Sequence, residues 1–132
     1  MVSIVITTFY RNDKLPKAIE SAIDQTYDEV EIVVVDGSGK EHAREVASSY
    51  DVQYVAQDEN EGIAADRDLG VQTATHDLIH FLDDDDRLGE TAIERKVVAY
   101  NENDEVGVVY SGIRWDGGHE VLPDPRVRGD VL

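Results

Sequence analysis

Apolar and polar positions alternate in blocks along this chain, and the blocks predict strands and helices in turn. Short apolar runs without a polar period are typical of strands buried on both faces. Such runs occupy residues 2–6, 32–35, 52–55, 77–82 and 106–111. Between them, apolar residues recur at helical spacing, which predicts helices over residues 14–25, 41–50, 63–74 and 91–100. Asp13 is expected to cap the first helix, with Pro16 in its first turn.

Strands that alternate with helices predict an α/β fold with a doubly wound, mostly parallel sheet and helices on both faces. In such a sheet, ligands bind beyond the carboxyl ends of the strands. Three polar segments leave those ends here: "TTFYR" at residues 7–11, "DGSG" at 36–39 and "DDDD" at 83–86. The fold therefore places an acidic segment where we expect a ligand.

The run of four aspartates, residues 83–86, follows directly on the fourth apolar strand. Two like charges about 4 Å apart repel by about 4 kcal/mol at an effective dielectric constant of about 20. Two interpretations remain open. The run is either a solvated acidic loop or a divalent-metal site, because carboxylates without cysteine suit Mg²⁺ or Mn²⁺ together with substrate phosphates. A bound cation would also offset the mutual repulsion.

Two further residues allow a structural and a functional interpretation. Asp36 stands before a glycine, so it is either a turn residue or a carboxylate that accepts a hydrogen bond from a ring N–H of a nucleotide base. Arg67 either pairs with its neighbours Asp66 or Asp68, or contacts a diphosphate.

The composition narrows the class of protein. The chain has 132 residues, 41% of them hydrophobic, and a net charge of −17 from 29 acidic and 12 basic residues. This charge argues against nucleic-acid binding, and its even spread predicts a halophilic source, where salt screens the repulsion. There is no cysteine, no signal peptide and no apolar run of membrane-spanning length. We expect a cytoplasmic protein, with the cytoplasmic face of the membrane as an alternative for the full-length protein.

Four segments in order resemble the family 2 glycosyltransferases of the GT-A fold: "VSIVITTFYR", "EIVVVDGSG", "NEGIAADRDLG" and "LIHFLDDDD". The resemblance covers about residues 1–111, which it identifies as a nucleotide-sugar-binding core. Residues 112–132 would begin a truncated acceptor-side region. The chain departs from the family pattern in "DGSG", which has one aspartate where many members have two. Asp68 likewise stands where the family has asparagine.

The resemblance implies inverting transfer of a sugar from a nucleotide-diphosphate donor, with Mn²⁺ or Mg²⁺, in glycan or polysaccharide synthesis. The donor would be linked to UDP or GDP, and the acceptor would be a glycan, a lipid-linked molecule or a protein. The implied metal ligands are Asp85 and Asp83, and Asp84 would face the ribose or sugar. The implied nucleotide-sugar site comprises Thr7, Thr8, Phe9, Arg11, Asp36, Arg67, Asp83 and Asp84.

An inverting transfer also needs a general base to deprotonate the acceptor. The resemblance places this base beyond residue 132, because the acidic residues of the last segment come too early: Asp116, Glu120, Asp124 and Asp130. The alternative is a catalytically inert nucleotide-binding or interaction module. A receiver-type phosphoacceptor domain is a weaker alternative, since it needs acidic residues after the first strand, where Thr7 and Thr8 stand.

Overall fold

The computed structural model describes residues 1–121, and its chain forms two compact units, Met1–Thr91 and Ala92–Leu132. The first unit contains β1 (Val2–Thr8), α1 (Leu15–Ile23), β2 (Val30–Asp36), α2 (Arg44–Ser48), β3 (Gln53–Ala56), α3 (Ile63–Thr73) and β4 (Leu78–Asp83). The second contains α4 (Ala92–Asn101) and an antiparallel pair of short strands, β5 (Ile113–Arg114) and β6 (Glu120–Val121). A division by function at residue 111 stays a prediction. In residues 1–121, no helix combines the length and apolar character that a membrane crossing requires.

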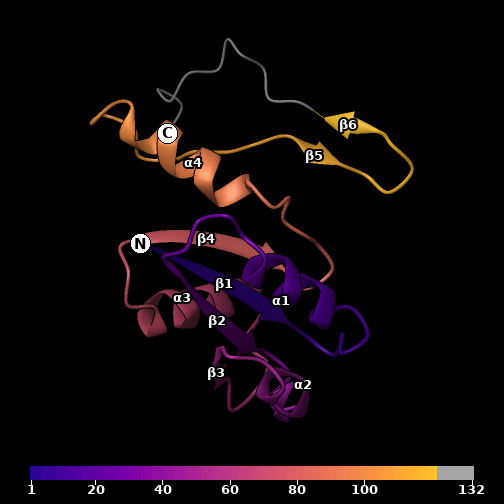
Figure 1. Ribbon diagram of the computed structural model, residues 1–132. Coiled ribbons are helices and arrows are strands. Elements are labelled where there is room, and N and C mark those ends of the chain that lie inside the picture. The colour runs from indigo at the N-terminus through magenta and orange to yellow at the C-terminus, as the bar shows by residue number, and fades with distance from the viewer. Residues whose placement is uncertain (122–132) are drawn as a thin grey trace. The chain divides into compact units, whose positions relative to one another are not determined.

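The sheet of the first unit confirms the predicted α/β fold. Its four parallel strands lie in the order β3-β2-β1-β4, and Figure 1 shows α1 in front of the sheet and α3 behind it. The chain moves outward from β1 through β2 to β3, and then returns to the other side of β1. The strand order therefore reverses between β1 and β4, and such a switch point is where an open α/β sheet holds its ligand.

The core lies on both faces of the central strands. Every residue of β1 is buried, and α1 covers one face with a buried stripe of Leu15, Ala18, Ile19 and Ala22. Helix α3 lies close to the other face through Gly70. A methyl group on Gly70 would come within 2.3 Å of Val5 Cγ1, so this position has no room for a side chain. Close packing of this kind holds α3 directly against the face of the sheet.

The strands run further than the apolar pattern indicated. β1 continues through Thr8, β2 through Asp36 and β4 through Asp83. The parallel ladder continues at these residues, where Thr8 lies opposite Asp36, and Thr7 opposite Asp83. Polar residues that the pattern assigned to loops are thus held in the sheet by backbone pairing.

Several predictions about secondary structure are wrong. Residues 106–111 form no strand, and Val108 and Tyr110 are more than half exposed. An apolar, β-branched run becomes a strand only where a neighbouring strand pairs with it. Asp13 does not cap α1, because the N-cap residue is Lys14 and makes no side-chain cap bond, although Pro16 lies in the first turn as expected. Helix α2 is also shorter than predicted, at Arg44–Ser48.

Candidate functional site

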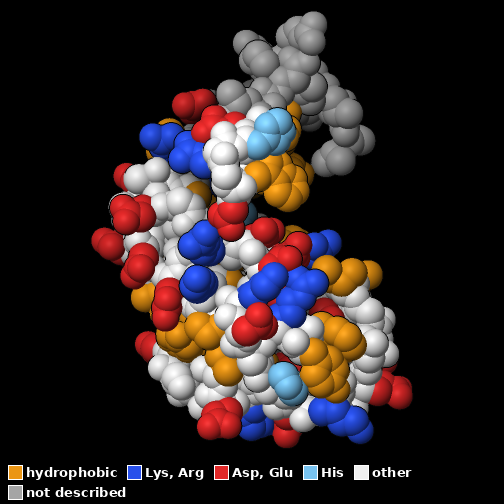
Figure 2. Space-filling view, turned by 90° about the vertical axis from the view of Figure 1, so that its right-hand side faces the viewer, with side chains coloured by type: hydrophobic (Ala, Val, Ile, Leu, Met, Phe, Trp, Pro, Cys, Tyr) orange, Lys and Arg blue, Asp and Glu red, His pale blue; other side chains and the backbone are white. Residues whose placement is uncertain are grey.

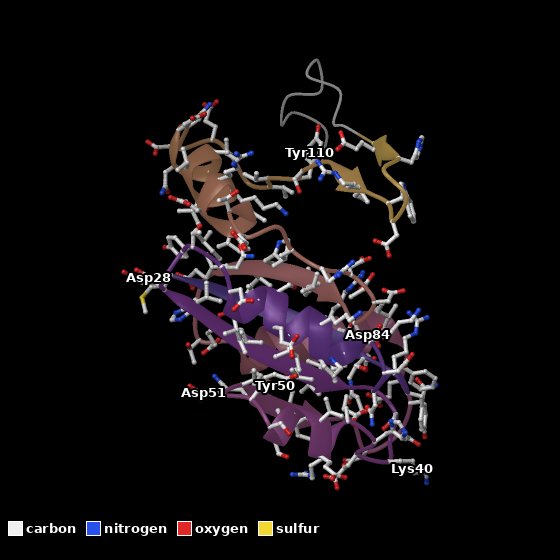
Figure 3. The ribbon with its side chains drawn as sticks, turned by 45° about the vertical axis from the view of Figure 1, so that its right-hand side comes forward. Asp28, Lys40, Tyr50, Asp51, Asp84 and Tyr110 are labelled. Atoms are coloured by element: carbon white, nitrogen blue, oxygen red, sulfur yellow. The ribbon has the colours of Figure 1, made fainter. Side chains whose placement is uncertain are left out.

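The predicted site residues meet at the carboxyl ends of β1, β2 and β4. The register places Thr7 of β1 opposite Asp83 of β4, and Thr8 of β1 opposite Asp36 of β2. Figure 3 shows Asp84 at this end of the sheet, whereas Asp28 and Asp51 lie at the opposite end. The topology therefore gathers residues from three distant segments of the chain.

Asp84 is turned inward, away from the rest of the acidic run, and is only 5% exposed. Its Oδ2 accepts hydrogen bonds from Thr8 Oγ1 at 2.9 Å and from the Phe9 N–H at 3.3 Å. Burial raises the pKa of Asp84, and these bonds and the Arg11 charge oppose the rise. Asp84 thus ties the loop after β1 to the loop after β4.

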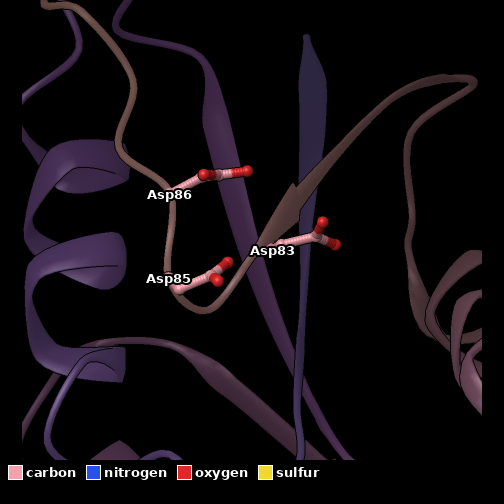
Figure 4. A group of neighbouring side chains, drawn as sticks. All are labelled: Asp83, Asp85 and Asp86. Carbon is pink, nitrogen blue, oxygen red and sulfur yellow. The ribbon is translucent and has the colours of Figure 1, made fainter. Parts of the chain in front are cut away.

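The other three aspartates form an oxygen-only cluster. The backbone turns here, with the Asp86 N–H donating to the Asp83 carbonyl at 3.1 Å. One carboxylate oxygen from each of Asp83, Asp85 and Asp86 lies within 4.8 Å of the others (Figure 4). Hard divalent cations such as Mg²⁺ prefer carboxylate oxygens, so this donor set fits the predicted metal. The sequence interpretation named Asp83 and Asp85 but did not name Asp86 as a ligand.

Two arginines offset part of the repulsion within the acidic run. Arg11 Nη1 lies 2.6 Å from Asp85 Oδ2 and 3.5 Å from Asp84 Oδ1. Arg67 Nη2 lies 3.3 Å from Asp83 Oδ1, a partner that the sequence did not suggest. Both guanidinium groups remain partly exposed, with 49% and 41% of their side chains accessible. They are therefore positioned to meet an anionic ligand as well as the carboxylates.

Asp36 is fully buried and holds the loop that follows β2. Its Oδ1 accepts from the Ser38 N–H at 2.9 Å, and its Oδ2 accepts from the Ala43 N–H at 2.8 Å and the Tyr54 hydroxyl at 2.7 Å. Burial raises the pKa of Asp36, but these hydrogen bonds together hold it below its ordinary value. Asp36 thus has the predicted turn role, through hydrogen bonds to residues further along the chain. A direct contact with a base stays a prediction.

The loop after β1 presents an aromatic surface. Thr7 is buried, whereas the Phe9 ring is 47% exposed and meets Tyr10 edge-on at 4.9 Å. Tyr10 adopts a left-handed φ of 55°, and its hydroxyl donates to the Ser38 carbonyl at 3.4 Å. This strained backbone is held by contacts with the loop after β2, as at many ligand sites. An exposed ring beside the strand ends suits stacking on a planar ligand.

Asp66 is a site residue that the sequence interpretation considered only as a partner for Arg67. It lies on α3, is 5% exposed, and its Oδ1 has no hydrogen-bond partner. Burial raises the pKa of Asp66, a hydrogen bond from Gln57 opposes the rise, and the charge of Asp36 adds to it. The sequence contains a signal for this burial. Asp66 stands one helical turn before Gly70, so both residues lie on the face of α3 that packs on the sheet.

Comparison with known proteins identifies the family pattern. The glycosyl transferase family 2 model matches residues 3–126. The chain is 33% identical over 129 residues to the glucosyl-dolichyl phosphate glucuronosyltransferase of Haloferax volcanii, covering 93% of this chain and 39% of that protein. Matches to two further glycosyltransferases cover 38% and 42% of their lengths. The chain thus spans about two fifths of these curated relatives.

Solved structures show the same fold. The chain superposes on S. aureus TarS 1–349 in complex with UDP-GlcNAc with a TM-score of 0.68, at 19% identity, over 76% of this chain and 31% of that one. It superposes on the mannosyltransferase PcManGT from Pyrobaculum calidifontis, in complex with GDP-Man and Mn²⁺, with a TM-score of 0.66 at 18% identity. That match covers 86% of this chain and 34% of the mannosyltransferase. At this identity the likeness establishes the GT-A type of α/β fold.

Proposed function

Because the chain belongs to glycosyl transferase family 2, we propose that it binds the nucleoside-diphosphate sugar of a glycosyltransferase that transfers the sugar with inversion. The observation that carries this proposal is the acidic turn at the switch point between β1 and β4, flanked by two arginines. Carboxylates and guanidinium groups at one strand end suit a ligand that combines a cation with phosphates.

We propose Mn²⁺ or Mg²⁺ as the cation, held by Asp83 and Asp85 with Asp86 alongside. The oxygen-only donor set supports this choice. The Mn²⁺ in the PcManGT complex supports it as well. A bound divalent cation would supply positive charge that neutralises the diphosphate and the leaving nucleotide. Without that charge, the carboxylates and the phosphates would repel each other.

The remaining residues bind and orient the donor. Phe9 offers its exposed ring to the base, while Thr7 and Thr8 shape the strand end beneath it. Asp84 fixes the loop after β1, and its predicted contact with the ribose or sugar stays a proposal. Arg11 and Arg67 lie beside the acidic run and are proposed to contact the diphosphate. Asp36 is proposed to belong to the base pocket, because it holds the loop that follows β2.

Donors linked to UDP or GDP are the proposed ligands, in line with the UDP-GlcNAc and GDP-Man named for the two structural neighbours. The acceptor is proposed to be a glycan, a lipid-linked molecule or a protein, in glycan or polysaccharide synthesis in the cytoplasm or at its membrane face. The general base is proposed to lie beyond residue 132. Of the early acidic residues, Asp124 and Asp130 lie outside the described residues.

Calorimetric titration with a panel of donors tests this proposal. UDP-glucose, UDP-GlcNAc, UDP-glucuronate and GDP-mannose would each be titrated into the chain in the presence of Mn²⁺. We expect saturable binding of at least one donor. Failure of all four donors and of free UDP and GDP to bind would overturn the proposal. Binding by a full-length protein that cannot transfer sugar would favour the inert-module alternative.

A further inference from the structure

Two consecutive residues of α3 carry buried atoms that lack a partner. Within residues 1–121, the buried side-chain atoms without a hydrogen bond are Asp66 Oδ1, Arg67 Nε and Asn12 Oδ1. The first is an acceptor and the second is a donor. Buried polar groups are nearly always satisfied by the protein, by water or by a ligand. Asp66 Oδ1, a buried acceptor without a partner, therefore points to a donor group of a polar ligand.

The carboxylate of Asp66 fills the space above Gly37, the residue that follows Asp36. A Cβ atom on Gly37 would lie 2.2 Å from Asp66 Oδ2 and 3.0 Å from Asp66 Oδ1. Gly37 does not have a positive φ, so its backbone would accept a side chain if Asp66 made room. The Asp66 carboxylate, which comes from α3, therefore occupies the space that a side chain at position 37 would otherwise fill.

Asp36 has much less acceptor capacity to offer a ligand. It is fully buried, and each of its two oxygens already accepts a hydrogen bond from the protein. Asp66 retains an oxygen with no partner beside the same loop. Rotation about the Cβ–Cγ bond of an aspartate is soft, so either oxygen can turn toward a ligand that enters there.

We propose that Asp66 accepts a hydrogen bond from the ring N–H of the donor's base, as the specificity-determining carboxylate of the nucleoside pocket. Asp36 holds the loop, and Asp66 reads the base. Uracil and guanine both offer a ring N–H, which is a donor of the kind that Asp66 Oδ1 lacks. This inference rests on the proposed function, because it names the group that recognises the nucleoside of the same ligand.

N-methylated nucleotides test this contact directly. UDP and GDP would be titrated in Mn²⁺, and the one that binds would be compared with its analogue, N3-methyl-UDP or N1-methyl-GDP, which lacks the ring N–H. We expect methylation to weaken binding to the wild type about tenfold, as for a hydrogen bond to a charged group. In Asp66→Ala, the parent nucleotide should bind about as weakly as the methylated one. Asp68→Ala is the matched control, since Asp68 is exposed on the same helix and its carboxylate accepts a hydrogen bond from Gln72, one turn further along that helix.

A double variant separates recognition of the base from stability of the loop. Gly37→Asp combined with Asp66→Ala moves the carboxylate to the loop, and it should restore the preference for the parent nucleotide over the methylated one. If methylation costs Asp66→Ala as much affinity as it costs the wild type, Asp66 does not read the base and the inference is wrong. If the wild type binds neither UDP nor GDP, the proposed function itself fails.

Discussion

Thr8 Oγ1 donates a buried hydrogen bond to Asp84 Oδ2 at 2.9 Å, joining residues that lie 76 positions apart in the sequence. Thr8 ends β1 and Asp84 follows β4, so this bond bridges the switch point of the sheet. It turns one of four adjacent aspartates into the interior and leaves the other three as a cluster. The repulsion within the acidic run is thus reduced by one inward carboxylate and two arginine partners.

Replacing Thr8 by valine should destabilise the chain. The shape is nearly unchanged, but Asp84 loses a buried donor, which costs about 1–3 kcal/mol. Urea unfolding of both proteins at neutral pH measures the difference. Thr73→Val is the control, because the Thr73 hydroxyl donates to the Leu69 carbonyl of its own helix. Its expected change is about 0.5 kcal/mol or less. Equal stabilities of the two variants would show that the bridge contributes little.

Asp36 should stabilise the fold in a pH-dependent way. Its folded-state pKa lies below the ordinary value of 3.8, so its ionisation adds stability above that pH. This contribution is lost as the pH falls through the lower folded-state pKa. Asp36→Asn should therefore lose about 1–3 kcal/mol at pH 7, and the deficit should shrink below pH about 4. Unfolding free energies between pH 3 and pH 7 test this, with the exposed Asp58→Asn as control. A deficit that stays constant across this range would refute the assignment.

Arg11 should compete with a metal ion for Asp85. Its guanidinium lies 2.6 Å from Asp85 Oδ2, and both side chains are partly exposed. Measured exposed ion pairs are typically worth about 0.2–1 kcal/mol, so Arg11→Gln should bind Mn²⁺ about 1.5- to fivefold more tightly in the absence of nucleotide. Electron paramagnetic resonance of free Mn²⁺ measures this affinity. Arg44→Gln, which removes a partner of Glu41 instead, is the control. Unchanged or weaker Mn²⁺ binding by Arg11→Gln would place the metal elsewhere.

Salt should stabilise this chain. Its net charge is −17, and Figure 2 shows Asp and Glu side chains spread over the visible face rather than gathered in one patch. Screening shortens the reach of this repulsion from about 10 Å at 0.1 M to about 3 Å at 1 M ionic strength. The thermal midpoint should rise between 0.1 M and 2 M KCl at pH 7. The rise should be smaller near pH 4, where part of the carboxylates are neutral. A midpoint that stays flat or falls at pH 7 would count against the halophilic prediction.

The sequence predicted the parallel sheet because its first four strands are locally apolar and separated by helical patterns. It placed the strand ends too early at Thr8, Asp36 and Asp83, since polar residues there interrupt the apolar runs while backbone pairing continues. The same local signal failed at residues 106–111, which are apolar but belong to neither sheet of the described part of the chain. Pairing is a long-range property that a single run cannot reveal.

The site was predictable in outline for a similar reason. Strand topology brings the ends of β1, β2 and β4 together, so Thr8, Asp36 and the acidic run could be placed from the pattern. The inward turn of Asp84 could not, because it depends on a hydrogen bond across 76 positions. Asp66 was missed because its significance depends on its carboxylate occupying the space above Gly37, which only the packing of α3 shows.

The central claim is that the acidic turn binds a nucleoside diphosphate through a divalent cation. Calorimetric titration of UDP and GDP, into the wild type and Asp85→Asn, with Mn²⁺ and with chelator, tests it most directly. Asp51→Asn is the control, since Asp51 lies at the opposite end of the sheet (Figure 3). We predict that the wild type and Asp51→Asn bind one of the two nucleotides in the presence of Mn²⁺ but not in chelator. Asp85→Asn should bind that nucleotide at least about tenfold more weakly than the wild type in Mn²⁺. Equal binding by the wild type in chelator, or wild-type binding by Asp85→Asn, would contradict the claim and leave Asp83, Asp85 and Asp86 as a solvated acidic turn.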